Sequence, residues 1–562
     1  MKKVCNHCSA EFEITQEDLD FYDQVSPSFK NEKHSIPSPT HCPDCRKQRR
    51  LIWANIRNLF WRDCDGTKKK MLSVYPVNAK FPVYNLDYWF GDNWDPLDYG
   101  RDFDFSQPFF DQFSDMFYQV PKFSRHSLLS TLENSEYVNY ASYLKNCYLV
   151  FHTTFAEDCY YSFGIKHCKN VVDSLHCYNS ELLYECVYCF DSYRLKYSHN
   201  SKNCSDSAFL FHCQSCKNCF ACSNLSQKEY YVFNKFVGKD AFEKIMADMK
   251  KGSYSLIQQA HKKFFTIKEN TIVPESVNLQ IEDCSGDNLQ NCQNVKSSFN
   301  VIDARDCKYI ERVYGGIENC YDYDQFGTNA KFIYECECCG VNLNNLLFCL
   351  KCRDGSSNLI YCMNCVSCED CFACDGLQHK KYCILNKQYT KEEYEELIPK
   401  IIRHMKQTQE WGEFWPQSLS PFSYDITEAN AYFPLLKNEV QEKGWFWEED
   451  QSTETSYMGA NVELEDSIHN CNEDICQKIL KCKVSGKPYK IIPQEFSFYK
   501  KMNIPIPRIS PAERQKQRMI LRNPRKLWKR NCDKCEKEIE TTYAPERPEI
   551  VYCEECYLKE IY

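Results

Sequence analysis

The sequence lacks several features that would assign it to familiar functional classes. No stretch approaches the ~18 consecutive apolar residues of a membrane-spanning helix, and the first residues contain no apolar core of a secretory signal. There is also no nucleotide-binding glycine loop, no nucleophile elbow and no HExxH motif. These absences predict a cytoplasmic protein without membrane contact or an evident small-molecule substrate, and they favour a protein that is not an enzyme.

One kind of enzyme stays open as an alternative. Some parallel β-helices are carbohydrate-active enzymes that use Asp, Lys or Arg on one face, and Asp191, Tyr193, Asp206 and Tyr323 are polar candidates of this type. No catalytic constellation stands out among them, and on a repeat fold such residues are more often turn or ladder residues.

Charge is unevenly distributed along the 562 residues, whose formal net charge is −9. Residues 46–70 carry nine Lys/Arg and two Asp, and residues 482–535 carry fifteen Lys/Arg and three Asp/Glu. The two segments together hold +19, so the rest of the chain holds −28. Basic ends around an acidic middle suggest an anionic partner that is met at the ends.

Two pairs of CxxC motifs, one pair near each end, supply four cysteines each. They are Cys5, Cys8, Cys42 and Cys45 at one end, and Cys532, Cys535, Cys553 and Cys556 at the other. Four thiolates from two such knuckles suit a tetrahedral Zn²⁺ with no open coordination position. We therefore predict two structural zinc ions. The other cysteines among the 38 are expected to be mostly small buried residues in a reducing cytoplasm.

The N-terminal segment resembles a family of small bacterial zinc-binding domains of the treble-clef or zinc-ribbon type. The resemblance covers about the first 50 residues and lies in Cys5-x2-Cys8-x3-Phe12, Thr15-Gln16-Glu17, Phe21-Tyr22, Pro39 and Cys42-Pro43-Asp44-Cys45-Arg46. It implies a zinc-binding module. The whole chain is similar to large bacterial proteins that combine zinc ribbons with repeats, and this similarity implies no activity.

Each end also has the pattern of a tandem pair of related modules, because residues 21–64 parallel residues 498–532 at Phe-Tyr, Pro-x-Pro, Arg-Asn and Trp positions. In each pair, one module has lost most of its ligands. The degenerate knuckles contain Cys482, Ser485, Ser510 and Glu513 in one case, and Cys64 and Thr67 in the other. We predict that these modules hold no metal and persist through the packing of aromatic and proline residues.

A nine-residue spacing of cysteines runs through the middle of the chain, at positions 159, 168, 177, 186, 204, 213 and 222, with Leu195 in the missing place. The pattern recurs later, since residues 212–235 match residues 364–387. A fixed short period is typical of stacked repeat folds. The sequence thus predicts a mainly β protein with two tandem parallel β-solenoid lobes, two nine-residue units in each coil, and capping helices at 239–251 and 391–407.

Cysteines at steps of three allow a second interpretation. Cys213, Cys216, Cys219 and Cys222 have a spacing that resembles iron–sulfur ligation. Related repeats, however, place Val171 or a serine at the position of Cys216, and a ligand position would not drift to valine. We favour an inward ladder of small residues, and a redox or iron–sulfur protein stays open as an alternative.

Positive and aromatic residues are interleaved in both basic segments, a pattern that favours single-stranded nucleic acid through phosphate contacts and base stacking. The candidate contacts are Arg46, Lys47, Arg49, Arg50, Arg57, Arg514, Arg518, Arg522, Arg525, Lys526, Lys529 and Arg530. We therefore predict a non-enzymatic adaptor that binds RNA, or a ribonucleoprotein such as the ribosome. Two alternatives stay open: a scaffold that binds a protein on a solenoid face, and pairing of the basic residues with acidic segments of the same chain, such as 86–116.

These observations divide the chain into seven parts. They are an N-terminal zinc module (1–63), a degenerate knuckle with an acidic-aromatic linker (64–125), two solenoid lobes with their caps (126–255 and 256–410), a linker (411–475), a degenerate basic module (476–530) and a C-terminal zinc ribbon (531–562).

Overall fold

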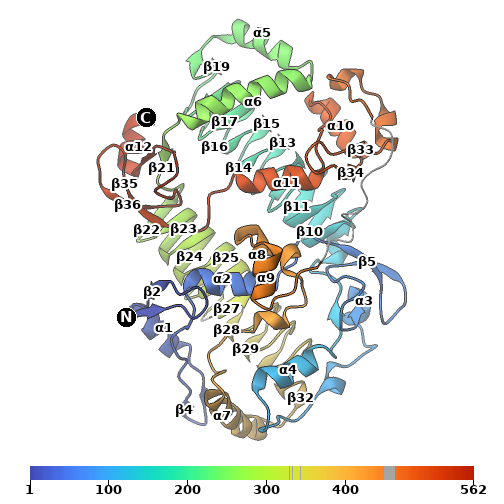
Figure 1. Ribbon diagram of the computed structural model, residues 1–562, viewed down its shortest axis with the longest axis vertical. Helices are drawn as coiled ribbons and strands as arrows, with labels where there is room; N and C mark the ends of the chain where they lie inside the picture. Colours follow the sequence, from blue (N-terminus) through green and yellow to red (C-terminus); the bar gives the residue numbers. More distant parts are fainter. Residues whose placement is uncertain (328–329, 332, 342, 449–461, 562) are drawn as a thin grey trace.

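The computed structural model describes residues 1–327, 330–331, 333–341, 343–448 and 462–561. The chain is mainly β, as predicted, and two long sheets dominate it, one of 12 strands and one of 11. Figure 1 shows the first sheet in the upper half of the molecule and the second below it. None of the helices in the described part of the chain combines the length and the apolarity that crossing a bilayer requires.

Both sheets are parallel except for a short antiparallel hairpin at the C-terminal end of each. The first sheet contains β9 (Leu132–Glu133), β10 (Val138–Lys145), β11 (Val150–Glu157), β12 (Lys166–Val172), β13 (Glu181–Tyr184), β14 (Val187–Phe190), β15 (Tyr193–Lys196), β16 (His199–Lys202), β17 (Ser205–Phe211), β18 (Phe220–Ser223), β19 (Tyr231–Val232) and β20 (Lys235–Phe236). The second contains β22 (Leu279–Glu282), β23 (Gly286–Lys296), β24 (Ser298–Lys308), β25 (Glu311–Glu318), β26 (Tyr321–Phe326), β27 (Tyr334–Glu337), β28 (Asn344–Leu347), β29 (Ser357–Ile360), β30 (Glu369–Phe372), β31 (Lys381–Ile384) and β32 (Lys387–Gln388).

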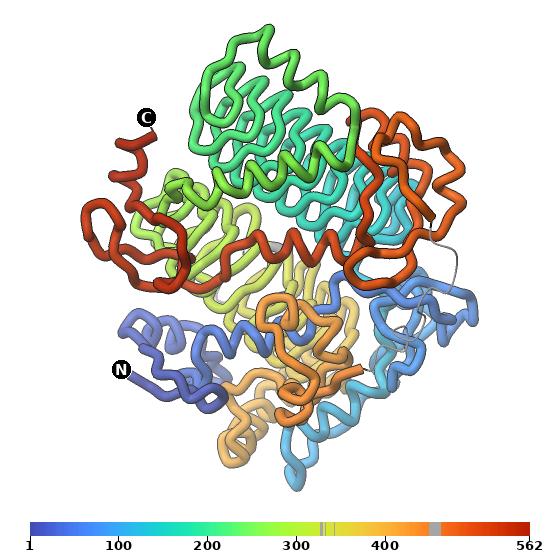
Figure 2. Tube along the Cα trace, turned by 45° about the horizontal axis from the view of Figure 1, so that its top comes forward, coloured from blue at the N-terminus to red at the C-terminus, as the bar shows by residue number. Residues whose placement is uncertain are grey.

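The pairing register corrects the predicted length of the repeat. In the first sheet Val138 pairs with Val150 and Glu181 with Tyr193, so paired residues are 12 apart. In the second sheet the interval is 11 between β22 and β23, 12 between β23 and β24 and between the last parallel strands, and 13 in the middle, where Tyr321 pairs with Tyr334. Two nine-residue units in each repeat would place paired residues 18 apart, so that part of the prediction is wrong. Figure 2 shows the successive repeats stacked side by side.

The underlying unit is three residues long. Every third residue from Tyr140 to Phe233 has a positive φ, and from Ala141 to Leu225 the residue after it points into a core of Cys, Ser, Thr, Leu, Ile, Val and Ala side chains. Asparagine and aspartate tolerate the left-handed conformation, and their side chains form ladders in which Asn146 donates to Asp158 at 3.1 Å. Because the unit is a triplet, every multiple of three, nine included, keeps a residue on the inward side.

The nine-residue cysteine spacing has a local cause in this geometry. Most inward thiols of the first sheet lie within hydrogen-bonding distance of two carbonyls, one two residues before and one nine residues after, and the single S–H can donate to either. The Sγ of Cys168 lies 3.3 Å from the Cys177 oxygen, and the Sγ of Cys213 lies 3.6 Å from the Cys222 oxygen. These thiols therefore act as small core residues that bond to backbone carbonyls. This arrangement agrees with the inward ladder of small residues favoured by the sequence analysis.

Helices follow both sheets. The first is followed by α5 (Lys239–Met249) and by α6 (Tyr254–Glu269), a helix that the sequence had not indicated. The second is followed by α7 (Lys391–Gln407), at the predicted bounds. Phe264 of α6 packs on Phe209, with ring centroids 5.6 Å apart. Figure 1 shows α6 across the upper sheet and α7 at the lower end of the molecule.

The N-terminal segment forms two small modules built on antiparallel hairpins. The first contains β1 (Lys2–Val4), β2 (Glu11–Glu13), α1 (Gln16–Gln24), β3 (Ser28–Phe29), β4 (Glu32–Lys33) and α2 (Pro43–Leu51). The second contains β5 (Phe60–Asp63), β6 (Lys70–Ser73), β7 (Val83–Tyr84) and α3 (Leu86–Trp89), and α4 (Phe109–Phe117) and β8 (Lys122–Phe123) follow.

The C-terminal segment repeats this plan. Its first module contains β33 (Leu480–Lys481), β34 (Pro488–Tyr489), α10 (Pro493–Met502) and α11 (Pro511–Ile520). Its second contains β35 (Trp528–Asn531), β36 (Glu538–Thr541), β37 (Val551–Tyr552) and α12 (Glu554–Ile561). β37 also pairs with β21 (Val273–Pro274), which lies just before the second sheet.

Residues 411–448, which the sequence assigned to a linker, are folded against the second sheet. The segment contains α8 (Glu428–Tyr432) and α9 (Lys437–Glu442), and the indole of Trp415 donates to the Phe348 carbonyl at 2.7 Å. Residues 449–461 of the predicted linker lie outside the described residues.

Candidate metal centres and the basic helices

The N-terminal cysteines meet because a hairpin faces the start of a helix. Cys5 and Cys8 lie on the β1–β2 connection, whereas Cys42 is the N-cap of α2 and Cys45 lies in its first turn. All four Sγ atoms lie within 4.8 Å of one another, and those of Cys8 and Cys42 are 3.7 Å apart. The predicted group of four thiols is therefore able to hold a metal ion.

The C-terminal cysteines form the same arrangement. Cys532 and Cys535 lie on the β35–β36 hairpin, and Cys553 and Cys556 lie at the start of α12. Their Sγ atoms also lie within 4.8 Å of one another. Within the described residues, these two groups are the only ones that bring three or more metal-ligating side chains together in this way.

Backbone N–H groups prepare both sites for thiolates. The Cys42 N–H donates to the Sγ of Cys5 at 3.3 Å, and the Cys553 N–H donates to the Sγ of Cys532 at 3.3 Å. Burial raises the pKa of Cys532, but the surrounding N–H groups outweigh it and lower the pKa to about 6. Because thiolates are the metal-binding form and four of them leave no position for water, both sites suit a structural metal and not a catalytic one.

The two degenerate modules keep the geometry of the knuckle without its ligands. The Sγ of Cys482 accepts from the N–H groups of Ser485 at 3.5 Å and Ser510 at 3.3 Å. The Sγ of Cys64 accepts from Thr67 at 3.4 Å and Asn85 at 3.2 Å. Sequence comparison of the two ends identified all of these positions except Asn85. Asn85 is the N-cap of α3, and this role can be recognised only when the position of the helix is known.

The basic residues of α2 are buried, and they pair with acidic residues of the second sheet. Arg46 and Arg50 both bind Asp322 of β26, with N–O distances of 2.9 and 3.0 Å, and each guanidinium reaches a different carboxylate oxygen. Arg50 also binds Asp324 at 2.6 Å. Burial opposes the charge of Arg46, but Asp322 and the neighbouring acidic groups together outweigh burial and raise the pKa of that guanidinium above its ordinary value.

The rest of the α2 face is paired in the same way. Arg49 donates to Glu335 of β27 at 2.9 Å through its Nε, and the Nζ of Lys47 lies 2.5 Å from Glu311 of β25. The side chain of Arg49 is only 5% exposed. The sequence predicted that the basic residues of α2 contact nucleic acid. In the structure they instead contact the acidic middle of the same chain.

Helix α11 makes the equivalent contact with the first sheet. Arg514 and Arg518 are four residues apart, as Arg46 and Arg50 are, and both bind Asp173, which follows β12, at 2.8 and 2.9 Å. Each guanidinium again reaches a different oxygen of the carboxylate. Helices α2 and α11 thus share one arrangement. In each, two arginines one helical turn apart bind one buried aspartate of a sheet.

Other arginines predicted to contact nucleic acid are also buried or already paired with groups of the same chain. Arg525 contacts Glu311 and lies over the ring of Tyr432 at 3.9 Å, and Arg522 lies over the same ring at 4.4 Å. Burial lowers the pKa of Arg57 to about 10. Arg530 binds Asp533 at 3.0 Å and keeps 11% of its side-chain surface exposed.

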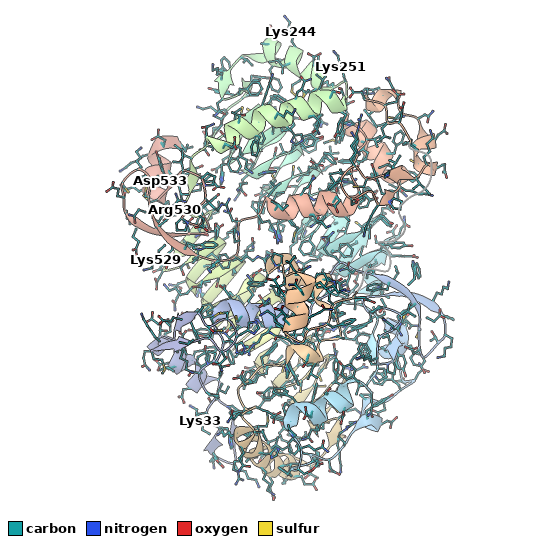
Figure 3. The ribbon with its side chains drawn as sticks, viewed as in Figure 1. Lys33, Lys244, Lys251, Lys529, Arg530 and Asp533 are labelled. Atoms are coloured by element: carbon teal, nitrogen blue, oxygen red, sulfur yellow. The ribbon has the colours of Figure 1, made fainter. Side chains whose placement is uncertain are left out.

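Two of the predicted nucleic-acid contacts keep most of their surface in solvent. The side chain of Lys526 is 53% exposed and that of Lys529 is 70% exposed. Figure 3 shows Lys529 on the outer side of the C-terminal module. The side chains of Arg46, Lys47, Arg49, Arg50, Arg514, Arg518 and Arg525, which the sequence predicted as nucleic-acid contacts, are instead buried and paired with carboxylates of the same chain.

Comparisons with known proteins add little to this description. No family model matches the chain, and no curated protein matches it. Among solved structures, the chain is similar to one from Desulfovibrio desulfuricans G20 that is described as a "putative acetyltransferase". The two are 9% identical over 50% of this chain and 81% of that one, and the TM-score is 0.09, so the similarity carries no argument about fold or function.

We call each pair of arginines that shares one buried aspartate a clamp, and the clamp of Arg46 and Arg50 on Asp322 leads to a stability prediction. Asp322→Asn should lower the free energy of unfolding by about 3–5 kcal/mol, because it leaves two buried guanidinium groups without their shared countercharge. Asp206→Asn is the matched control, since Asp206 pairs with Arg194 at 3.2 Å where both side chains reach solvent. It should cost less than about 1 kcal/mol. Urea unfolding measures both, and equal losses would contradict the clamp.

The four-thiol groups lead to a prediction about metal content. Cys535→Ser should reduce the bound metal from two ions to one per chain, because three thiols and a hydroxyl hold the ion much more weakly. Cys482→Ser is the control, and it should leave the metal content unchanged because Ser485 and Ser510 occupy the positions of partner ligands. Elemental mass spectrometry of the purified chains measures both. A loss of metal in the control would show that the degenerate module is a site after all.

Proposed function

We propose that the chain is a non-enzymatic scaffold protein in which two structural zinc ions each stabilise one module of the tandem pair at either end. The observation that carries this proposal is that each four-thiol group belongs to a tandem pair whose basic helix is buried against an acidic face of a parallel sheet. Helix α2 of the N-terminal pair binds the second sheet, and α11 of the C-terminal pair binds the first. The metal sites therefore lie where they can stabilise the architecture.

Zinc is the metal that best fits the donor set. Four thiolates within 4.8 Å of one another suit a tetrahedral, redox-inert ion, and two-residue spacers within each knuckle are typical of structural zinc modules. The resemblance of the first 50 or so residues to zinc-binding domains supports the same assignment. We expect elemental analysis to identify both ions as zinc. All 38 cysteines are free thiols in the structure, which fits a reducing compartment such as the cytoplasm.

We also interpret each parallel sheet as one wall of a β-solenoid. A register of 12 residues with every third side chain inward corresponds to a coil of four triplets. Such coils present an extended surface on which equivalent side chains repeat at the strand spacing, and repeat folds commonly use surfaces of this kind for binding.

A row of exposed aromatic rings on the first sheet is the surface that we assign to a protein partner. Tyr143 and Phe155 stack at 4.6 Å, Phe155 and His167 stack at 4.8 Å, and both pairs of rings are within 7° of parallel. Tyr143 is 52% exposed and Phe155 is 46% exposed. Rigid aromatic side chains contribute most of the energy in many protein interfaces.

This assignment predicts the behaviour of the chain when it is isolated from its native cells. Tagged protein should co-purify with a protein partner after nuclease treatment, and substitution of both Tyr143→Ser and Phe155→Ser should remove that partner. Tyr193→Ser alters an exposed ring elsewhere on the same sheet and should retain it. Quantitative mass spectrometry of the eluates measures the difference. A partner that the double variant retains would contradict the assignment.

A nucleic-acid adaptor is the second candidate, and the exposed lysines of the C-terminal segment favour it. Lys526 lies over the ring of Trp528 at 5.5 Å, and Lys529 follows on β35. Exposed cations beside a half-buried aromatic ring provide the phosphate contacts and stacking that single-stranded RNA requires. The buried arginines would contribute only by holding this module in place.

The RNA candidate predicts a salt-dependent affinity that two lysines control. Substituting both Lys526→Gln and Lys529→Gln should weaken the binding of a fluorescent single-stranded RNA and reduce the slope of log affinity against log salt by about 1 for each phosphate that a lysine no longer neutralises. The control substitutes Lys33→Gln and Lys244→Gln, which lie on other parts of the surface (Figure 3). Fluorescence anisotropy at several salt concentrations measures the slopes. Equal slopes in the two double variants would exclude this surface.

A further inference from the structure

A cavity lies at the junction of the two sheets and the C-terminal module. Its volume is about 310 Å³, within the range of small-molecule sites. Its walls come from segments far apart in the sequence: strands β14, β16, β17, β23 and β24, helix α6, the chain from 521 to 525, and residues 542–549. Figure 1 shows these elements converging between α6 and the β35–β36 hairpin.

The cavity has a buried floor and an exposed rim. Tyr188, Phe299 and Asn300 on the floor are each no more than 8% exposed. On the rim, Phe265 is 61% exposed and Leu521 is 42% exposed. A ligand can therefore enter from solvent and be largely buried once it is bound.

A buried arginine beside the floor has an unused hydrogen-bond donor. Glu311 is the shared partner of Lys47, Arg312 and Arg525, and in the described part of the chain Arg312 also binds Glu428, at 3.1 Å. Arg525 lines the cavity, its side chain is 5% exposed, and its Nη2 has no hydrogen-bond partner among the described residues. A buried guanidinium with an unused N–H is costly unless a ligand completes its hydrogen bonds.

The lining holds three carboxylates, Glu269, Asp287 and Glu549, and three cations, Lys268, Arg525 and Arg547, and Arg547 is paired with Glu549. Asp287 already accepts hydrogen bonds from the backbone N–H groups of Val277 at 2.8 Å and Asn288 at 3.0 Å, and from the Thr542 hydroxyl at 3.3 Å. Burial raises its pKa. Lys268 of α6 also lines the cavity, and its Nζ lies 4.8 Å from the ring centroid of Phe211.

The rest of the lining suits a planar ligand with polar edges. Five aromatic side chains contribute to it, and they are Tyr188, Phe211, Phe265, Phe299 and Tyr543. Four asparagine side chains accompany them, and they are Asn200, Asn288, Asn300 and Asn523. Aromatic rings provide stacking surfaces, and amides both donate to and accept from the edge of a heterocyclic base.

We propose that this cavity binds a nucleotide, with the base among the aromatic and amide side chains and the phosphate beside Arg525. The nucleotide is either free or the end of an RNA strand, since the phosphate and base are the same in both. In the second case the strand leaves over the rim toward Lys526, which immediately follows Arg525. This site is separate from the metal centres and from the aromatic row proposed for a protein partner.

Isothermal titration calorimetry on the full metal-loaded chain tests the proposal. The probes are adenosine 5′-monophosphate, uridine 5′-monophosphate and a short single-stranded oligoadenylate. Arg525→Gln should weaken binding about 10-fold, the usual effect of losing a charge-assisted hydrogen bond. Lys268→Gln removes a cation at a half-buried position and keeps the test valid should Arg525→Gln fail to fold. Lys244→Gln, on α5, is the control and should bind as the wild type does (Figure 3).

The outcomes separate the two sources of the nucleotide. Mononucleotide binding that Arg525→Gln or Lys268→Gln weakens, with the control unaffected, supports a site for free nucleotides. Binding of the oligoadenylate alone, weakened by the same variants, supports a site for the end of an RNA strand. The proposal is overturned when no probe binds, or when the variants bind as tightly as the control.

Discussion

The structure depends on two arginines, one helical turn apart, that share one buried aspartate. Arg46 and Arg50 bind Asp322 on the second sheet, and Arg514 and Arg518 bind Asp173 on the first. A buried ion pair gives little net stability compared with apolar packing, but its loss is costly because an unpaired charge would stay in a medium of low polarity. The pairing therefore fixes where each module can dock more than it adds to the total stability of the protein.

The cysteine knuckles and the arginine clamps are structurally linked, because each knuckle adjoins the start of a clamp helix. Cys42 is the N-cap of α2, and Ser510 is the N-cap of α11, so in both modules the knuckle sets where the basic helix begins. In the first module a metal would hold that junction. In the second, the Sγ of Cys482 and the backbone N–H groups around it keep the same geometry without one. The fold of the module thus tolerates the loss of the metal, because the clamp and the core packing persist.

The uneven charge of the chain has an internal explanation. A net charge of −9 with basic ends and an acidic middle suggests an anionic partner, yet seven of the twelve candidate nucleic-acid contacts meet Asp322, Asp324, Glu335, Glu311 or Asp173 of the same chain. The surfaces that remain available to a partner are not the predicted basic helices. They are an aromatic row on the first sheet, a few lysines of the C-terminal segment, and a cavity lined by an arginine with an unused hydrogen-bond donor. Such surfaces arise from positions far apart in the sequence.

The sequence by itself determined the eight cysteines of the two candidate metal sites, the mainly β character, the duplication of the ends and the inward position of most other cysteines, because these depend on local spacing. It did not determine the length of the repeat, since a triplet unit makes nine and twelve equally consistent with inward cysteines and only strand pairing selects twelve. It also could not separate buried from exposed arginines. That distinction depends on an aspartate hundreds of residues away reaching the same place, and so only the tertiary structure decided it.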